Sequence, residues 1–78
     1  MKVVKLNKKH RLFHEGCVVA IKFTSPWSKG AMECRTELYK IDESKWLTYR
    51  SGTNRPYWIG FKDEKMMTFL LLKADFTN

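Results

Sequence analysis

The chain has 78 residues, 44% of them hydrophobic and 14% aromatic, and its 15 Lys and Arg residues against 8 Asp and Glu residues give a formal charge of +7. The aromatic content excludes a disordered basic tail, two cysteines exclude a disulfide-stapled scaffold, and no apolar run approaches the ~20 residues of a membrane span. With a lysine-rich opening that is unlike a signal peptide, residues 1–78 are expected to form one small, basic, soluble domain in the cytoplasm.

Two strands are predicted at the start of the chain. Residues 1–6 contain the β-branched pair Val3 and Val4, and a polar basic stretch follows. Residues 12–16 are compatible with one helical turn or with a wide loop. Residues 17–23 alternate with apolar side chains on both faces, which predicts a central strand with the N-terminal strand along its free edge.

A helix is predicted next. Ser25 is expected to cap it, with Pro26 at the first helical position. An apolar stripe at spacings of four, three, four and three then indicates an amphipathic helix that ends near residues 42–44, and its members are Trp27, Ala31, Cys34, Leu38 and Ile41.

A hairpin and a second helix complete the predicted elements. Residues 45–50 and 56–61 are aromatic and β-branched, and the turn-rich residues 51–55 join them. Asp63 and Glu64 suit a helix N-terminus. Periodicity alone leaves residues 66–72 open between a buried strand and a helix, and the Met and Leu content favours the helix.

The expected fold is therefore a two-layer α+β domain in the order β-β-α-β-β-α, with a four-stranded antiparallel sheet and two helices on one face. The charge follows this division. Residues 1–30 carry a net charge of +6 and residues 45–62 a net charge of +4, against −2 for residues 31–44 and −1 for residues 63–78. The excess positive charge is thus expected on the strands and their loops, on one side of the domain.

Cations interleaved with aromatic residues are typical of nucleic-acid binding, in which cations contact phosphates and flat rings stack on bases. The candidate aromatics are Trp46, Tyr49, Tyr57 and Trp58. The competing interpretation is that the aromatics form the core and the cations only keep the domain soluble. The residues predicted to contact nucleic acid or another partner are Lys8, Lys9, Arg11, Lys22, Lys45, Arg50, Arg55, Trp58 and Lys62.

The stretch Trp58-Ile59-Gly60-Phe61-Lys62-Asp63-Glu64, followed by an apolar helix, resembles the third strand of an RNA-recognition motif entering its second helix. The resemblance implies that Trp58 stacks on a base, while Ile59 and Phe61 belong to the core. The two residues before Trp58 are larger than in the family's pattern, the first strand has no partner aromatic, and a final strand is missing.

A second resemblance is one of general character. The small, basic, aromatic-rich chain, with its opening of residues 5–11, is similar to small accessory proteins of tailed bacteriophages. This similarity implies an effector that binds and modulates an acidic host protein in the host cytoplasm, as the alternative to a domain that binds DNA or RNA. Met66, Phe69 and Leu70 are the predicted protein interface, and a homodimer through the last helix is a third hypothesis.

Metal binding and catalysis have little support in the sequence. His10, His14, Cys17 and Cys34 are the residues with metal-ligand chemistry, but their spacing fits no zinc site, and both cysteines suit small buried hydrophobic positions. Cys17 and His14 form the one conceivable nucleophile and base, and no glycine-rich phosphate loop is present. No metal, no cofactor and no enzymatic activity are expected.

Overall fold

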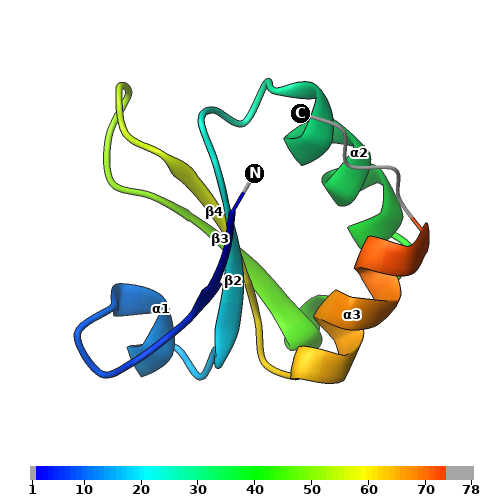
Figure 1. Cartoon of the computed structure of the whole chain (residues 1–78), viewed down its shortest axis with the longest axis horizontal. Helices are drawn as coiled ribbons and strands as arrows, with labels where there is room; N and C mark the ends of the chain where they lie inside the picture. The colour runs from blue at the N-terminus through cyan, green and yellow to red at the C-terminus, as the bar shows by residue number, and fades with distance from the viewer. Residues whose placement is uncertain (1, 74–78) are drawn as a thin grey trace.

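Four strands form one antiparallel sheet in this computed structural model, which describes residues 2–73 (Figure 1). The strands are β1 (Lys2–Lys5), β2 (Val19–Phe23), β3 (Trp46–Arg50) and β4 (Tyr57–Phe61). Their order across the sheet is β1-β2-β4-β3, so β2 and β4 are central and β1 and β3 lie at the edges. The α+β class and the four-stranded antiparallel sheet are confirmed, and so is the β3–β4 hairpin.

Three α-helices and a short 3-10 helix connect or follow the strands. They are α1 (Arg11–His14), α2 (Lys29–Leu38), η1 (Glu43–Lys45) and α3 (Glu64–Lys73). The order of the elements differs from the expected β-β-α-β-β-α, because α1 forms between β1 and β2. His10 begins this short helix, since its Nδ1 accepts the backbone N–H of Leu12 at 3.0 Å.

Helix α2 is shorter than expected at both ends. Ser28, and not Ser25, is its N-cap, and the Ser28 hydroxyl accepts the backbone N–H of Ala31. Trp27 therefore precedes the helix and is 75% exposed, outside the apolar stripe in which the sequence placed it. At the other end the helix stops at Leu38, and residues 43–45 form a separate 3-10 turn before β3.

Helix α3 confirms the helical interpretation of residues 66–72. Asp63 lies just before it, and its carboxylate accepts the backbone N–H of Lys65 at 2.9 Å. Among residues 2–73, no helix combines the length and the apolar composition that crossing a membrane requires.

The two faces of the sheet carry two separate apolar clusters. Alternate residues of β2 and β4 pack with α2 and α3 in the larger cluster, whose buried members include Ile21, Phe23, Cys34, Ile59 and Phe61. The smaller cluster lies on the opposite face, where α1 covers part of the sheet, and its buried members are Leu12, Cys17 and Ala20. Figure 1 shows α2 and α3 together on one side of the sheet and α1 on the other.

Candidate functional site

One row of side chains crosses the whole sheet on the face that carries α1. Lys2 of β1 is paired in register with Lys22 of β2, Lys22 with Trp58 of β4, and Trp58 with Tyr49 of β3. Directly paired residues of antiparallel strands point to the same face. The row therefore places two ammonium groups and two aromatic rings side by side, over three strand spacings or about 14 Å.

We call Lys2, Lys22, Trp58 and Tyr49 the cross-sheet row. Its two aromatic rings contact neighbouring cations. Nζ of Lys22 lies 5.5 Å from the ring centroid of Trp58, and the guanidinium carbon of Arg11 lies 5.6 Å from that of Tyr49. His10 sits edge-on to Trp58, with 4.5 Å between the ring centroids. Cation–π contacts of this kind position a charge without neutralising it.

These cations have no acidic partner in the part of the chain that is described. The ion pair found within residues 2–73 joins Lys40 to Glu37 at 3.6 Å, on α2 and the turn after it. Lys2 and Lys22 are directly opposed like charges, an arrangement that destabilises a sheet unless an anion lies between them. The row is thus a surface that attracts negative charge.

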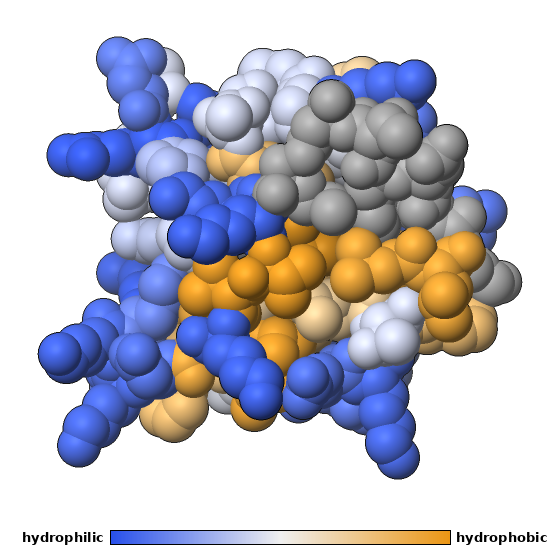
Figure 2. Space-filling view, in the orientation of Figure 1, coloured by the Kyte–Doolittle hydropathy of each residue, from blue (hydrophilic) through white to orange (hydrophobic). Residues whose placement is uncertain are grey.

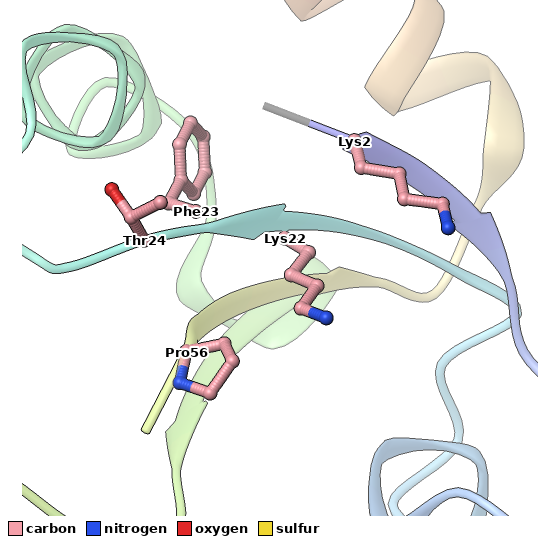
Figure 3. A pocket seen from close by; sticks show the side chains of 5 residues that line it. All are labelled: Lys2, Lys22, Phe23, Thr24 and Pro56. Carbon is pink, nitrogen blue, oxygen red and sulfur yellow. The ribbon is translucent and has the colours of Figure 1, made fainter. Parts of the chain in front are cut away.

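A hollow of about 400 Å³ lies at the lysine end of the cross-sheet row. Figure 3 shows the lining side chains, with Lys22 between Lys2 and Pro56, and with Phe23 and Thr24 at the end of β2. None of its five lining residues is acidic. Because Lys2 and Lys22 both line it, the hollow lies beside the lysine end of the row.

The predicted cations do not form one patch. Lys8 and Lys9 are exposed in the loop before α1, next to Arg11. Lys45 and Lys62 lie together at the far end of β4, where the Lys62 backbone N–H donates to the Lys45 carbonyl oxygen at 3.0 Å. Of the predicted basic residues, Lys22 lies in the cross-sheet row and Arg11 on its α1 flank, while the side chain of Lys62 lies on the same face beside Gly16, after α1.

The two arginines of the hairpin loop differ in role. Arg55 is exposed. The Arg50 guanidinium instead donates through Nε to the Arg55 carbonyl oxygen at 3.1 Å and through a terminal nitrogen to the Thr53 carbonyl oxygen. Arg50 therefore holds the loop of its own hairpin, which the charge count did not indicate.

The predicted protein interface is only partly at the surface. Leu70 is 1% exposed and belongs to the larger apolar cluster, because it faces the sheet from α3. Met66 is half-buried and packs against the same cluster. Phe69 is 53% exposed. Leu70 is thus corrected from an interface residue to a core residue.

Two residues of the site were missed in the sequence. Lys2 joins it only through the pairing of β1 with β2, and His10 only through the docking of α1 near Trp58. Tyr57, the other candidate aromatic of β4, is buried in the larger cluster and is not part of the site.

The metal-ligating residues do not assemble. Within residues 2–73, no three His, Cys, Asp or Glu side chains are grouped so that they would hold a metal ion. Cys17 and Cys34 are free, buried, and lie in different apolar clusters. Burial raises the pKa of Cys34 to about 12 and raises that of Cys17, where nearby Lys62 opposes the shift.

Comparisons with protein-family models, with curated proteins and with solved structures found no match to this chain.

Proposed function

We propose that the domain is a non-enzymatic binding protein that holds single-stranded nucleic acid, DNA or RNA, across the sheet face carrying α1. The observation that supports this most is the cross-sheet row. In it Lys2 and Lys22, which have no ion-pair partner within residues 2–73, are continuous with the rings of Trp58 and Tyr49. Phosphates would lie on the lysines and on Arg11. A base would lie against the rings.

The aromatic half of the row favours a single strand over a duplex. Trp58 and Tyr49 are half-buried, so part of each ring is accessible beside the cation that it holds. An unpaired base can stack on a ring face, and such stacking contributes about 1–3 kcal/mol per base to binding. In a duplex the bases stack on each other, and only the lysines and Arg11 would find partners.

The resemblance of residues 58–64 to an RNA-recognition motif agrees with this proposal. It implies that Trp58 is the stacking aromatic, and Trp58 is the ring that lies between Lys22 and His10. Ile59 and Phe61, which the resemblance assigns to the core, are fully buried.

The direct test measures binding of labelled single-stranded and double-stranded oligonucleotides of about 10 nucleotides, at about 50 mM and about 200 mM salt. The proposal expects tighter binding to the single strand and a loss of affinity at the higher salt. Absence of binding at low salt would reject it. Trp58→Leu should weaken binding, and Trp27→Leu is its matched control, because Trp27 is an exposed tryptophan whose cation partner is Arg35 of α2 and not a residue of the row.

A second candidate, the effector that binds an acidic host protein, rests on a different surface. Figure 2 shows apolar surface around β1 and α3. The large hydrophobic residues exposed on these two elements are Val3, Phe69 and Leu72, with exposed fractions of 43%, 53% and 82%. Such an apolar area with basic surroundings suits a protein partner.

Capture of one stoichiometric acidic protein from nuclease-treated bacterial lysate, lost on Leu72→Glu and kept in Trp58→Leu, would favour this second candidate. Loss on Trp58→Leu alone would instead place the protein partner on the cross-sheet row. Light scattering at high concentration tests the remaining hypothesis of a homodimer through α3. Both candidates imply a protein that works in the cytoplasm.

A further inference from the structure

We infer that the hollow lined by Lys2, Lys22, Thr24 and Pro56 is a subsite for one phosphate group of the bound strand. This inference rests on the proposed function and makes it more specific, because it fixes the end of the cross-sheet row at which the backbone of the nucleic acid is gripped. Figure 3 shows the hollow and its lining side chains.

The register of the sheet builds the charge of this subsite. Lys2 and Lys22 are directly paired across β1 and β2, so their side chains leave the same face at neighbouring positions. Neither lysine takes part in an ion pair among the described residues. An anion between them would relieve their mutual repulsion, and this gives the site a preference for a ligand with negative charge shared over several oxygens.

The position of Lys22 is held by its neighbours. Its Nζ lies 5.5 Å from the Trp58 ring centroid, and its half-buried side chain lies at the margin of the hollow. A long lysine side chain normally loses conformational freedom when it binds a ligand. The contact with Trp58 removes part of that freedom beforehand, which favours binding.

The remaining walls select the kind of anion. Pro56 has no backbone N–H and offers an apolar ring, while Thr24 is exposed and offers a hydroxyl donor. Two lysines act as point charges, and lysine is a common phosphate ligand in proteins. The volume of about 400 Å³ leaves room for the sugar attached to that phosphate.

A phosphate can reach this hollow from two sources, as an internal phosphodiester of the strand or as a terminal phosphomonoester. Oligonucleotides labelled at the 3′ end, with and without a 5′-phosphate, distinguish the two. Equal affinity of the two strands, with both weakened in the lysine variant below, indicates the internal phosphodiester. Tighter binding of the phosphorylated strand, lost in the lysine variant below, indicates the terminal group. Either result supports the inference.

The test compares Lys2→Gln/Lys22→Gln with Lys5→Gln. Lys5 is on β1 as well, but it is paired with Val19 and therefore points to the opposite face, so it controls for loss of charge near the N-terminus. The double variant should lose at least about tenfold in affinity at about 50 mM salt, and the slope of log affinity against log salt should become shallower by about 0.7, the value for one phosphate contact on a single strand. Lys5→Gln should change affinity by less than about twofold.

Outcomes that overturn the subsite are separable from those that overturn the proposed function. If the parent protein binds oligonucleotides and the double variant behaves as Lys5→Gln does, the subsite is wrong and the proposed function stands. If the parent binds no oligonucleotide, the proposed function is wrong. Titration with inorganic phosphate, followed by amide chemical shifts of Lys22 and Thr24, then tests the hollow alone, and unchanged shifts reject it. Stronger binding of a poly-glutamate peptide than of an oligonucleotide overturns the choice of phosphate over carboxylate.

Discussion

A Cβ atom built on Gly60 of β4 would lie 2.8 Å from Sγ of Cys17, closer than such atoms approach in folded proteins. It would also lie 3.2 Å from Cδ1 of Leu12. Cys17 and Leu12 are buried, so neither side chain is free to move aside. The absence of a side chain at Gly60 is therefore what allows α1 and the segment after it to lie directly on β4, next to the cross-sheet row.

Replacing this glycine is expected to destabilise the domain. Gly60→Ala should lower the free energy of unfolding by about 1–3 kcal/mol, because the added methyl group overpacks the smaller apolar cluster. Urea denaturation measures the change. Gly52→Ala is the control, since its Cβ would meet only Cγ of Arg55 at an ordinary 3.5 Å. In the double variant Gly60→Ala/Cys17→Ala, the smaller side chain at position 17 should recover part of the stability that Gly60→Ala loses. Strict additivity of the two changes in unfolding free energy would contradict the proposed clash.

Arg50 is expected to stabilise the β3–β4 hairpin more than it contributes charge to a binding surface. Arg50→Lys keeps the charge but loses the planar fork that donates to the carbonyl oxygens of Thr53 and Arg55. We expect a loss of about 0.5–1 kcal/mol in the free energy of unfolding, typical of a surface hydrogen-bond pair. Arg55→Lys serves as the control, because the contact of Arg55 with Arg50 is made by its backbone. Equal stability of both variants and the parent would contradict this role.

Strand β2 and helix α2 were predictable because each repeats a pattern over five or more residues, whereas residue type indicated β1, the hairpin strands and α3. Residues 17–23 alternate, and the stripe of Ala31, Cys34 and Leu38 keeps helical spacing. Helix α1 was not predictable in this way, since its four residues are too few to show a period and its cap is a histidine. The start of α2 was misplaced because Ser25 and Ser28 are both good caps and only one of them accepts the N–H of a helical residue.

The candidate site was less predictable than the fold, because it depends on register. The sequence indicates that Lys22 and Trp58 lie on strands, but only the pairing of β2 with β4 makes them neighbours. Likewise, the charge of Arg50 is visible in the sequence. The carbonyl oxygens that accept hydrogen bonds from its guanidinium reach it only through the conformation of the hairpin loop. Charge arithmetic therefore located the basic segments without identifying which cations are free to bind.

Stability is expected to depend on the protonation of His10. Burial lowers the pKa of His10 below its ordinary value of 6.5, so the unfolded chain takes up a proton at a higher pH than the folded chain. Protonation also removes the Nδ1 lone pair that accepts the Leu12 N–H. The contribution of His10 is thus fully present above about pH 6.5 and is lost as the pH falls through the lowered pKa of the folded state.

The measurement compares the free energy of unfolding of the parent with that of His10→Asn between about pH 7.5 and about pH 5. Asparagine is a good helix cap that does not titrate, so the comparison isolates the contribution of the His10 imidazole. The parent should lose more stability than His10→Asn on acidification. If the unfolding free energies of the two proteins change in parallel with pH, protonation of His10 does not affect stability.

The two cysteines are expected to differ in reactivity. The thiolate is the reacting form, and both thiols are buried, with the pKa of Cys34 raised to about 12. Labelling therefore requires an opening of the structure. Cys17 is covered by the four-residue helix α1 and by a small cluster, whereas Cys34 lies in the larger cluster between α2 and the sheet. Smaller cooperative units open at a lower cost in free energy.

Iodoacetamide at about pH 8, followed by peptide mass spectrometry, should label Cys17 before Cys34, and both at similar rates in urea. Equal rates in the native protein would show that α1 opens only together with the main core. A single-stranded oligonucleotide bound at the cross-sheet row contacts the α1 flank through Arg11, so it should slow the labelling of Cys17 more than that of Cys34. Protection of both cysteines to the same degree would instead place the ligand on a surface that stabilises the whole domain.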